Sequence, residues 1–439
     1  MDYVQNIIFL LLAFVGIGLF IRNILKIKRN ILLGKSENRS DHIAQRWLLV
    51  LRIAIGQGKM MIRPISGLLH IIVYSGFIII NIELIEIFAD GILGTHRYFG
   101  KILPASFYNF VTGTVDILSF LVLIAVTIFF IRRNITKVSR LNSKDLLGWP
   151  HMDGNLILAI EFLMMLSLLI MNASDSTLQR MGIEYSCGFF PISTYTFEQL
   201  FSSFSKESLF IWQKSTWWFH YIGVLFFLNY LYFSKHLHII LAFPNTYFAS
   251  LHKKGQLNNL ESVSKEVKLL IAPNTDPYSA EADDTIPEKF GVSDATDLSW
   301  VQLLNAYTCT ECGRCTSNCP ANLTGKKLSP RKIMMDVRDR IDEIGRNIDK
   351  NGHFLEDGKQ LLGDYISTEE LWACTTCNAC VEACPLLIDP LSIIIDMRRY
   401  LVMEKTDAPN ELNIMMNNIE NNNAPWQFSQ SDRANWTKE

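Results

Sequence analysis

Apolar residues are gathered into five long stretches in the first half of the chain. They cover residues 7–24, 65–88, 115–131, 156–171 and 217–233. An α-helix rises about 1.5 Å per residue, so each stretch is long enough to cross a membrane hydrocarbon core of about 30 Å. The pattern therefore predicts five membrane-spanning helices. The first begins without a basic region and is followed by no small-residue cleavage site, so we do not expect a cleaved signal peptide.

The second half of the chain is polar and carries shorter helical patterns. Apolar residues at helical spacing predict helices from near Asp297, over residues 331–344 and over residues 391–402. The predicted fold class is mainly α, a five-helix transmembrane bundle followed by an α-helical ferredoxin domain. Its parts are a transmembrane domain at 1–245, a linker at 246–297, a ferredoxin domain at 298–405 and a tail at 406–439. The tail is either a docking segment or a disordered Asn-rich segment.

Basic residues in the loops predict the orientation of the helices. Residues 22–64 hold ten Lys and Arg against two acids, and residues 132–154 hold five against two. The loops at 89–114 and 173–216 hold only two and three basic residues. Positive loops stay in the cytoplasm, so the N-terminus is expected outside and the C-terminal half inside.

One loop contains an amphipathic segment at residues 43–61. Its apolar residues are interrupted by Arg46, Arg52 and Lys59. The pattern fits a helix lying at the cytoplasmic membrane surface, and a simple surface helix fits equally well.

Composition narrows the possible partners. The chain has 439 residues, is 49% hydrophobic and carries a net charge of −2, so nothing suggests binding to nucleic acid. No glycine-rich nucleotide loop and no nucleophile–base pair is found, so no catalytic residues are predicted. Of the nine cysteines, only Cys187 lies outside two motifs, and a free thiol in a loop is its expected state.

The two cysteine motifs share the spacing C-x2-C-x2-C-x3-C-P. The first holds Cys309, Cys312, Cys315 and Cys319; the second holds Cys374, Cys377, Cys380 and Cys384. This spacing is typical of two [4Fe–4S] clusters, in which the fourth cysteine of each motif serves the other cluster. The predicted ligand sets are Cys309, Cys312, Cys315 and Cys384 for one cluster, and Cys374, Cys377, Cys380 and Cys319 for the other. Zinc is the alternative, but a tetrahedral zinc site needs only four ligands and does not require a third closely spaced cysteine in each motif.

Thiolates that bind metal need a reducing compartment, so the cysteine motifs are expected in the cytoplasm. This agrees with the orientation obtained from the loop charges, which is an independent argument. We expect a multi-pass protein of the cytoplasmic membrane of a bacterium.

Four histidines lie in or beside the predicted spans. His70 lies near the cytoplasmic end of the second span, and His220 near the outer end of the fifth. His236 and His238 follow the fifth span on the inner side. Eighteen residues separate His220 from His238, which is five turns of a continuous helix, so both would point the same way, about 27 Å apart. His236 would then be rotated off that face, as a headgroup or surface residue.

These positions predict haem ligands, because ionisable or ligating side chains inside a membrane are costly and usually functional. His70 and His238 lie on different helices at the same depth and are the predicted axial ligands of one haem b. A second haem is possible at His220, with His96 or a methionine such as Met171 as its partner. Packed, hydrogen-bonded histidines are the alternative in each case.

The membrane half resembles the five-helix cytochrome b subunit of respiratory nitrate reductase and the related membrane subunit of heterodisulfide reductase. The resemblance rests on the topology, on His70 and on the pair His220 and His238. It implies an outer N-terminus and haem histidines on spans two and five. The second span has no second histidine, a departure from the two-haem pattern.

The segments 306–315 and 372–380 resemble heterodisulfide-reductase-type iron–sulfur proteins, which include an iron–sulfur subunit of anaerobic glycerol-3-phosphate dehydrogenase. Residues 234–245 resemble the junction in fusions of the two parts. Many such relatives continue into domains with paired CCG motifs. This chain has none, so the resemblance implies a separate CCG-type subunit or an electron-transfer flavoprotein as cytoplasmic redox partner.

These observations predict a membrane-bound electron-transfer subunit that links a cytoplasmic redox partner to membrane quinone, in either direction, through two [4Fe–4S] clusters and haem b. A haem-free membrane anchor or redox-sensing scaffold with iron–sulfur clusters is the second hypothesis. A transporter driven by electron flow is the third, and it would use Glu83, Glu86 and Glu161.

Overall fold

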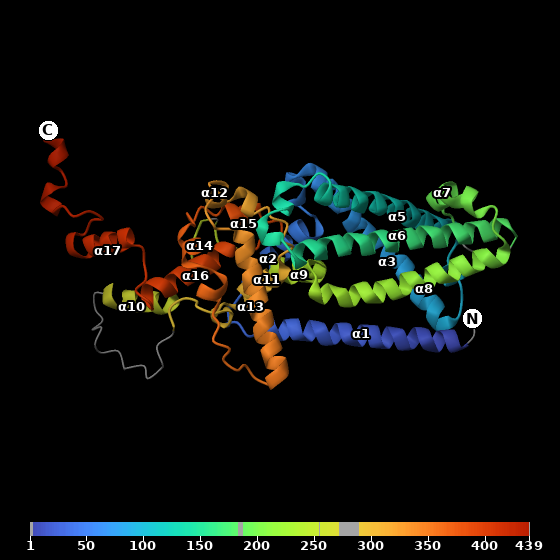
Figure 1. The fold of residues 1–439 in the computed structure, drawn as a ribbon, viewed down its shortest axis with the longest axis horizontal. Coiled ribbons are helices and arrows are strands. Elements are labelled where there is room, and N and C mark those ends of the chain that lie inside the picture. The colour runs from blue at the N-terminus through green and yellow to red at the C-terminus, as the bar shows by residue number, and fades with distance from the viewer. Residues whose placement is uncertain (1–2, 183–187, 254, 272–288, 439) are drawn as a thin grey trace.

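The computed structural model describes residues 3–182, 188–253, 255–271 and 289–438. Every regular element in these residues is a helix, and their only β-type pairings are isolated bridges. The mainly α fold class is therefore confirmed. Cys187 lies outside the described residues. Figure 1 shows a long helical bundle joined at one end to a more compact helical part.

Five long helices form the bundle. They are α1 (Tyr3–Ile31), α3 (Pro64–Leu93), α5 (Ala105–Asn134), α6 (Trp149–Arg180) and α8 (Lys206–Tyr230). Helix α6 packs between α5 and α8, while α3 packs on α5 and α1 on α8. Each predicted apolar stretch begins inside one of these helices. Four of them are long and apolar enough to cross a membrane, and α8 qualifies only when joined to the bent segment that follows it.

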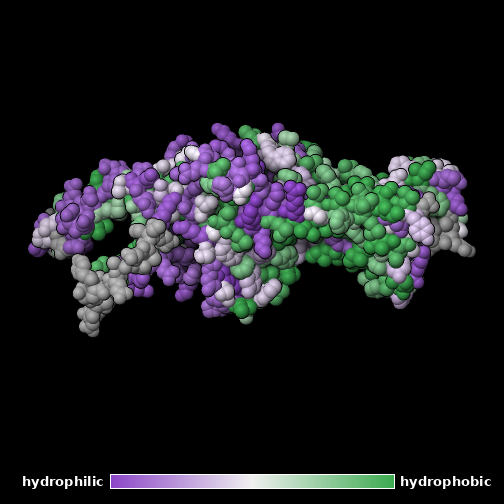
Figure 2. All heavy atoms as spheres, turned by 90° about the horizontal axis from the view of Figure 1, so that it is seen from below, coloured by the Kyte–Doolittle hydropathy of each residue, from purple (hydrophilic) through white to green (hydrophobic). Residues whose placement is uncertain are grey.

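The surface of the bundle is hydrophobic. Figure 2 shows a continuous hydrophobic region over the helices, with hydrophilic surface at both ends. On α1 alone, Phe14 is 80% exposed and many other large apolar side chains point outward. So much exposed apolar surface fits contact with lipid chains rather than water. The chain is a membrane protein.

The fifth span does not continue as a straight helix. Helix α8 ends at Tyr230 and is followed by two short 3₁₀ turns, Leu231–Phe233 and Lys235–Leu237. Ser234 between the turns is extended, and α9 (His238–Tyr247) leaves at 97° to α8. The prediction that His220 and His238 share one helix face is therefore wrong. Asp153 of α6 stabilises the break, because it accepts hydrogen bonds from the Tyr230 hydroxyl (2.5 Å) and the Lys235 backbone N–H (3.2 Å).

The amphipathic segment at 43–61 is not one helix. It forms α2 (Ile43–Val50), a π-helical turn (Leu51–Ile55) and then a 3₁₀ turn at Met60–Ile62. Arg46 is 1% exposed and donates hydrogen bonds to the carbonyl oxygens of Tyr247 and Ala249. This arginine therefore anchors α2 to the end of α9 instead of facing solvent.

The C-terminal part is built mainly from α11, α13 and α16. Its helices are α11 (Trp300–Thr308), α12 (Pro320–Leu323), α13 (Pro330–Asn351), α14 (Thr368–Trp372), α15 (Ala379–Ala383) and α16 (Pro390–Met403). The three helices predicted here are present. Ser299, Ser329 and Asp389 cap α11, α13 and α16, and a proline occupies the first position of the latter two.

The core of the C-terminal part includes the end of α1. Ile333, Val337 and Ile341 of α13 are fully buried, and Ile27 and Ile31 of α1 join the same cluster. The cysteine-rich part thus packs directly on the bundle, at the end opposite the N-terminus (Figure 1). The remaining helices are α4 (Tyr98–Ile102), α7 (Pro191–Phe201), α10 (Glu261–Ile271) and α17 (Asn410–Asn422). Helix α17 occupies the predicted tail and extends away from the body (Figure 1).

Candidate electron-transfer centres

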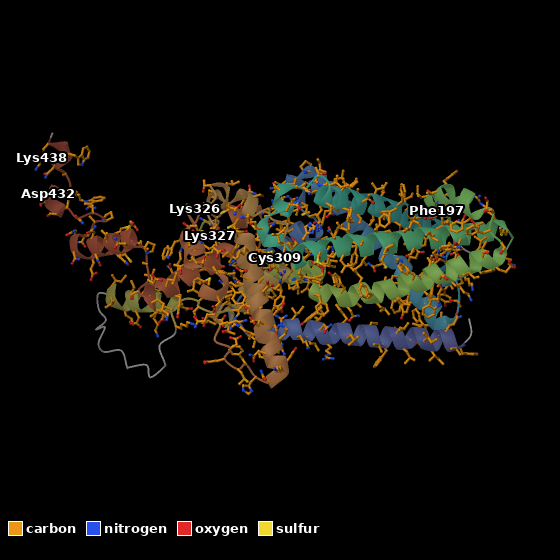
Figure 3. The ribbon with its side chains drawn as sticks, viewed as in Figure 1. Phe197, Cys309, Lys326, Lys327, Asp432 and Lys438 are labelled. Carbon is orange, nitrogen blue, oxygen red and sulfur yellow. The ribbon has the colours of Figure 1, made fainter. Side chains whose placement is uncertain are left out.

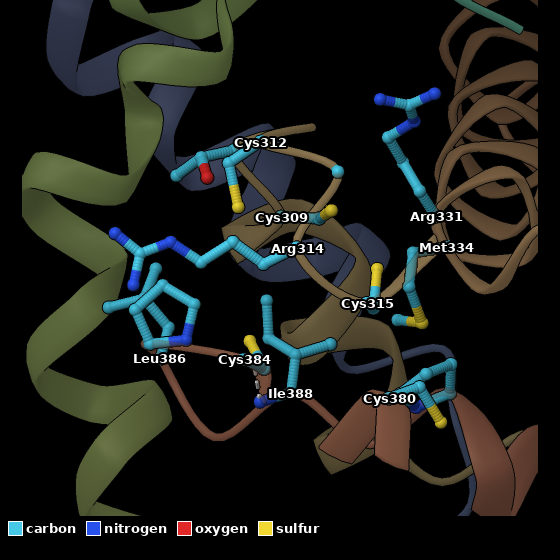
Figure 4. A pocket seen from close by; sticks show the side chains of 14 residues that line it. Cys309, Cys312, Arg314, Cys315, Arg331, Met334, Cys380, Cys384, Leu386 and Ile388 are labelled. Carbon is cyan, nitrogen blue, oxygen red and sulfur yellow. Dashed lines mark hydrogen bonds between the residues drawn. The ribbon is translucent and has the colours of Figure 1, made fainter. Parts of the chain in front are cut away.

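The eight motif cysteines surround two pockets. The first is lined by Cys309, Cys312, Cys315 and Cys384, with Cys380 at its edge. In Figure 4 the four sulfurs surround the pocket, and the sulfur of Cys380 lies further out. The second pocket is lined by Cys319, Cys374, Cys377 and Cys380. The structure thus groups the cysteines in the two sets that the spacing predicts, with the fourth cysteine of each motif in the opposite pocket.

The arrangement of the sulfurs fits a cluster better than a single ion. No group of three or more His, Cys, Asp or Glu side chains in the described residues converges on a point where one metal ion could be held. Sulfurs spread around a pocket suit a four-iron cube, whereas a zinc ion needs ligands at about 2.3 Å. The backbone N–H groups of Thr376 and Ile388 approach the sulfurs of Cys374 and Cys384 at 3.4 Å. Such contacts stabilise charged sulfur.

Burial raises the pKa of several of the cysteine thiols. It raises the pKa of Cys309 and Cys380 to about 12, and that of Cys384 to about 11. At neutral pH these thiols would therefore stay protonated unless a metal stabilised their thiolates. Buried thiols that need a metal to ionise, gathered around a pocket, fit an iron–sulfur site.

Loops of the membrane half wrap the first pocket. Arg140 donates a hydrogen bond to the carbonyl oxygen of Cys312 (2.6 Å), and Lys59 donates one to that of Cys384 (3.2 Å). Arg314 lines the pocket and is held by the carbonyl oxygen of Lys59 (3.0 Å). Arg331 also lines it. The first pocket is therefore cationic and lies against the bundle, as the position of Cys309 in Figure 3 illustrates.

A motif residue links the first pocket to the histidine segment. Glu311 is 4% exposed and forms ion pairs with Lys235 (2.5 Å) and Arg338 (2.9 Å). Burial alone would raise the pKa of Glu311, but Arg338 and Lys235 lower it overall. Because Lys235 precedes His238 by three residues, the cysteine loop and the histidine segment are fixed to each other.

The structure brings His70, His236 and His238 together. His70 of α3 lies within electrostatic range of both His238 and Arg314. His238 Nδ1 lies 3.0 Å from the carbonyl oxygen of Lys235. That hydrogen bond leaves Nε2 for an axial bond, which is the usual arrangement in a metal-binding histidine. Nδ1 of His70 is buried without a hydrogen-bond partner in the described residues. Among the described residues, His70 therefore has an unpartnered buried nitrogen, and the ring of His238 is fixed by a backbone contact.

His236 is not the surface residue that the rotation argument predicts. Its side chain is 23% exposed, and its ring lies 5.4 Å from that of His238. Its Nε2 lies 3.6 Å from Glu161. The prediction is wrong because the helix breaks before His236, so rotation about a straight α8 axis no longer applies. Glu161 is thus at this end of the bundle.

At the far end of the bundle, the structure opposes His96 as an iron ligand. His96 Nε2 lies 3.0 Å from Asp175, and its Nδ1 lies 3.2 Å from the Gln213 amide nitrogen. With both nitrogens hydrogen-bonded, His96 cannot also bind iron. His220 is 3% exposed, and its Nδ1 contacts the carbonyl oxygen of Met164 at 3.2 Å. Met171 is buried in the core of the bundle. A packed, hydrogen-bonded histidine describes His220 well.

The comparisons with known proteins agree with the cysteine geometry. A family model described as a 4Fe-4S dicluster domain matches residues 308–388. A probable iron-sulfur-binding oxidoreductase of Bacillus subtilis is 28% identical, over 99% of this chain and 61% of the relative. One component of a CoB-CoM heterodisulfide reductase from Methanosarcina acetivorans is 33% identical, over 24% of the chain and 52% of the relative. The chain is a heterodisulfide-reductase-related iron–sulfur protein.

A further relative of this iron–sulfur protein is an EtfAB:quinone oxidoreductase of Syntrophomonas wolfei. It is 30% identical, over 93% of the chain and 56% of the relative. The chain therefore spans about 60% of the length of these two long relatives. No solved structure matches it.

The basic residues around the first pocket of this heterodisulfide-reductase-related protein were not predicted from the sequence. Arg314 stands inside the first motif, so its position was the one available signal. Lys59, Arg140 and Arg331 come from distant segments and are brought there only by the fold.

We expect Arg314→Gln to lower the reduction potential of the first cluster, because a positive charge nearby favours the more negative reduced state. A unit charge about 8 Å away, at an effective dielectric constant of about 20, contributes about 2 kcal/mol, or roughly 80 mV for one electron. A redox titration followed by electron paramagnetic resonance measures the potential. Arg314→Lys keeps the charge and should shift it much less. Equal potentials in both variants and the wild type would contradict this role.

Proposed function

We propose that this chain is the membrane-bound electron-transfer subunit of an oxidoreductase complex. It passes electrons between a cytoplasmic redox partner and membrane quinone, using two [4Fe–4S] clusters and haem b. The observation that carries the proposal is the position of the first cysteine pocket against the bundle, where Arg140 and Lys59 of the membrane half donate hydrogen bonds to the carbonyl oxygens of Cys312 and Cys384. Arg314 lines that pocket and lies within electrostatic range of His70.

The protein's own contribution is to fix distances and charges. Bound clusters and haem supply one-electron carriers. The Glu311–Lys235 ion pair, at 2.5 Å, ties the first cysteine loop to the segment that holds His238. Arg331 is 1% exposed and pairs with Asp145, 2.6 Å away, in a loop of the membrane half. Because these contacts are buried, they hold the first pocket at a fixed distance from α3 and α9.

The second cysteine pocket supports docking of a soluble partner. Cys377 there is exposed, whereas Cys309 of the first pocket is buried. A partner can thus approach the second pocket while the first faces the bundle. The name of the Syntrophomonas wolfei relative supports an electron-transfer flavoprotein as that partner, and a CCG-type subunit is the other candidate. We place the ferredoxin domain in the cytoplasm and the N-terminus outside the cytoplasmic membrane of a bacterium.

Stopped-flow reoxidation tests the function. The purified full chain in lipid nanodiscs is reduced with dithionite and mixed with a water-soluble quinone analogue. We expect the cluster and haem absorbance to return to the oxidised spectrum after mixing, with quinol formed in proportion. Reduced clusters that stay reduced in the presence of quinone, in a preparation without haem, would instead favour the anchor or sensor hypothesis.

A further inference from the structure

A second group of buried charges lies at the end of the bundle that is distant from the cysteine pockets, where Phe197 is labelled in Figure 3. It contains five carboxyl groups from three helices: Glu83, Glu86 and Asp90 of α3, Asp116 of α5 and Asp175 of α6. Each of these residues is at most 5% exposed. The guanidinium of Arg97, which is 2% exposed, contacts three of them: Glu83, Glu86 and Asp175.

Four of the five carboxyl groups are well supplied with hydrogen-bond donors. Asp90 accepts from the Thr95 hydroxyl and from the backbone N–H groups of Arg97 and Tyr98, at 2.8 to 3.0 Å. Asp116 accepts from the backbone N–H groups of Ile192 (2.7 Å) and Ser193 (3.0 Å). Such donors stabilise an ionised carboxylate.

The other two members of this group have comparable support. Glu86 accepts from the Phe99 backbone N–H (2.9 Å) and the Tyr108 hydroxyl (3.0 Å). Asp175 contacts Arg97 (2.9 Å) and His96 (3.0 Å). Both can therefore remain charged.

Glu83 differs from all of them. Its Oε1 contacts Arg97 Nη1 at 2.6 Å, while its Oε2 is buried and has no hydrogen-bond partner in the described residues. Arg97 is shared with Asp175 and Glu86, so its single charge is divided among several carboxylates. A buried carboxylate with an unsatisfied oxygen is costly, and the neutral acid avoids that cost.

A metal ion could also balance the charge, but no group of ligands in the described residues converges on such a site. A proton is the remaining cation. We propose that Glu83 holds an exchangeable proton as a neutral carboxylic acid, which makes it a proton-binding site inside this membrane domain. Arg97 stabilises the carboxylate that remains after the proton leaves.

This proton can exchange with water at the same end of the bundle, where the His96 side chain is 24% exposed.

Infrared spectroscopy of the full chain in lipid nanodiscs tests the protonation state directly. We expect a carbonyl band of a protonated carboxyl group, sensitive to D₂O, that is lost in Glu83→Gln and retained in Asp90→Asn. The amide keeps an oxygen for Arg97, so the variant should fold, and its unfolding midpoint checks this. A wild-type band that persists unchanged in Glu83→Gln would overturn the proposal.

Discussion

Replacing Cys312 by alanine is expected to remove the first iron–sulfur cluster and abolish electron transfer to quinone. Cys312 lines the first pocket, and its carbonyl oxygen is held by Arg140 at 2.6 Å. Alanine removes one of four thiolates, and three sulfurs are left to carry a cube that needs four ligands. Iron per polypeptide should fall to about half, and quinone-linked reoxidation should fall by at least about a hundredfold. Iron and acid-labile sulfide analysis, with stopped-flow spectroscopy, measure both effects.

Two controls make the Cys312 result specific. Cys187→Ala changes the cysteine outside both motifs and should keep the full iron content. Cys377→Ala removes a ligand of the exposed second pocket, so it should halve the iron while leaving the signal of the first cluster in the paramagnetic resonance spectrum. Full quinone-linked turnover in Cys312→Ala would contradict a relay through the first cluster.

The cysteine sites could be predicted from the sequence because the ligands of each motif are close together in the chain and have a characteristic spacing. The motif C-x2-C-x2-C-x3-C-P predicts that its first three cysteines bind one cluster and its fourth binds the other cluster. This prediction does not depend on the residues between the two motifs. The family match over residues 308–388 agrees with this prediction. The helices around the motifs were equally accessible, because apolar residues recur there at helical spacing.

The break after α8 could not be predicted in the same way. The residues around it, such as Leu231, Tyr232 and Phe233, are apolar and compatible with helix. The break depends on Asp153, a residue about eighty positions earlier that accepts hydrogen bonds from Tyr230 and Lys235. A tertiary contact of this kind overrides local helical preference.

The group of buried charges around Arg97 could not be predicted either, because it also depends on tertiary contacts. Arg97 counts as one of two basic residues in an outer loop, yet the fold buries it among carboxylates of α3 and α6. The sequence shows that Glu83 and Glu86 lie in a predicted span, where burying a charged side chain costs free energy. It does not predict that one loop arginine supports several of them. Which carboxylates a buried arginine contacts is decided only when the helices pack together.

Replacing His238 by alanine is expected to remove the inner haem, while His236→Ala should retain it. Both imidazoles lie in the same short segment, with ring centres 5.4 Å apart, so the two variants form a closely matched pair. His238 alone has a backbone partner for Nδ1, the Lys235 carbonyl oxygen at 3.0 Å, which fixes the ring and leaves Nε2 for iron. The reduced-minus-oxidised spectrum and haem extraction measure haem per polypeptide.

His220→Ala completes the haem series. His220 already contacts the Met164 carbonyl oxygen at the other end of the bundle, and His96 is held by Asp175 and Gln213. We therefore expect His220→Ala to keep one haem per polypeptide and to lower the unfolding midpoint only modestly. Loss of haem in His236→Ala, with retention in His238→Ala, would reverse the ligand assignment at the inner end. Two haems in the wild type and one in His220→Ala would instead establish a second site at the distal end, with an axial partner other than His96.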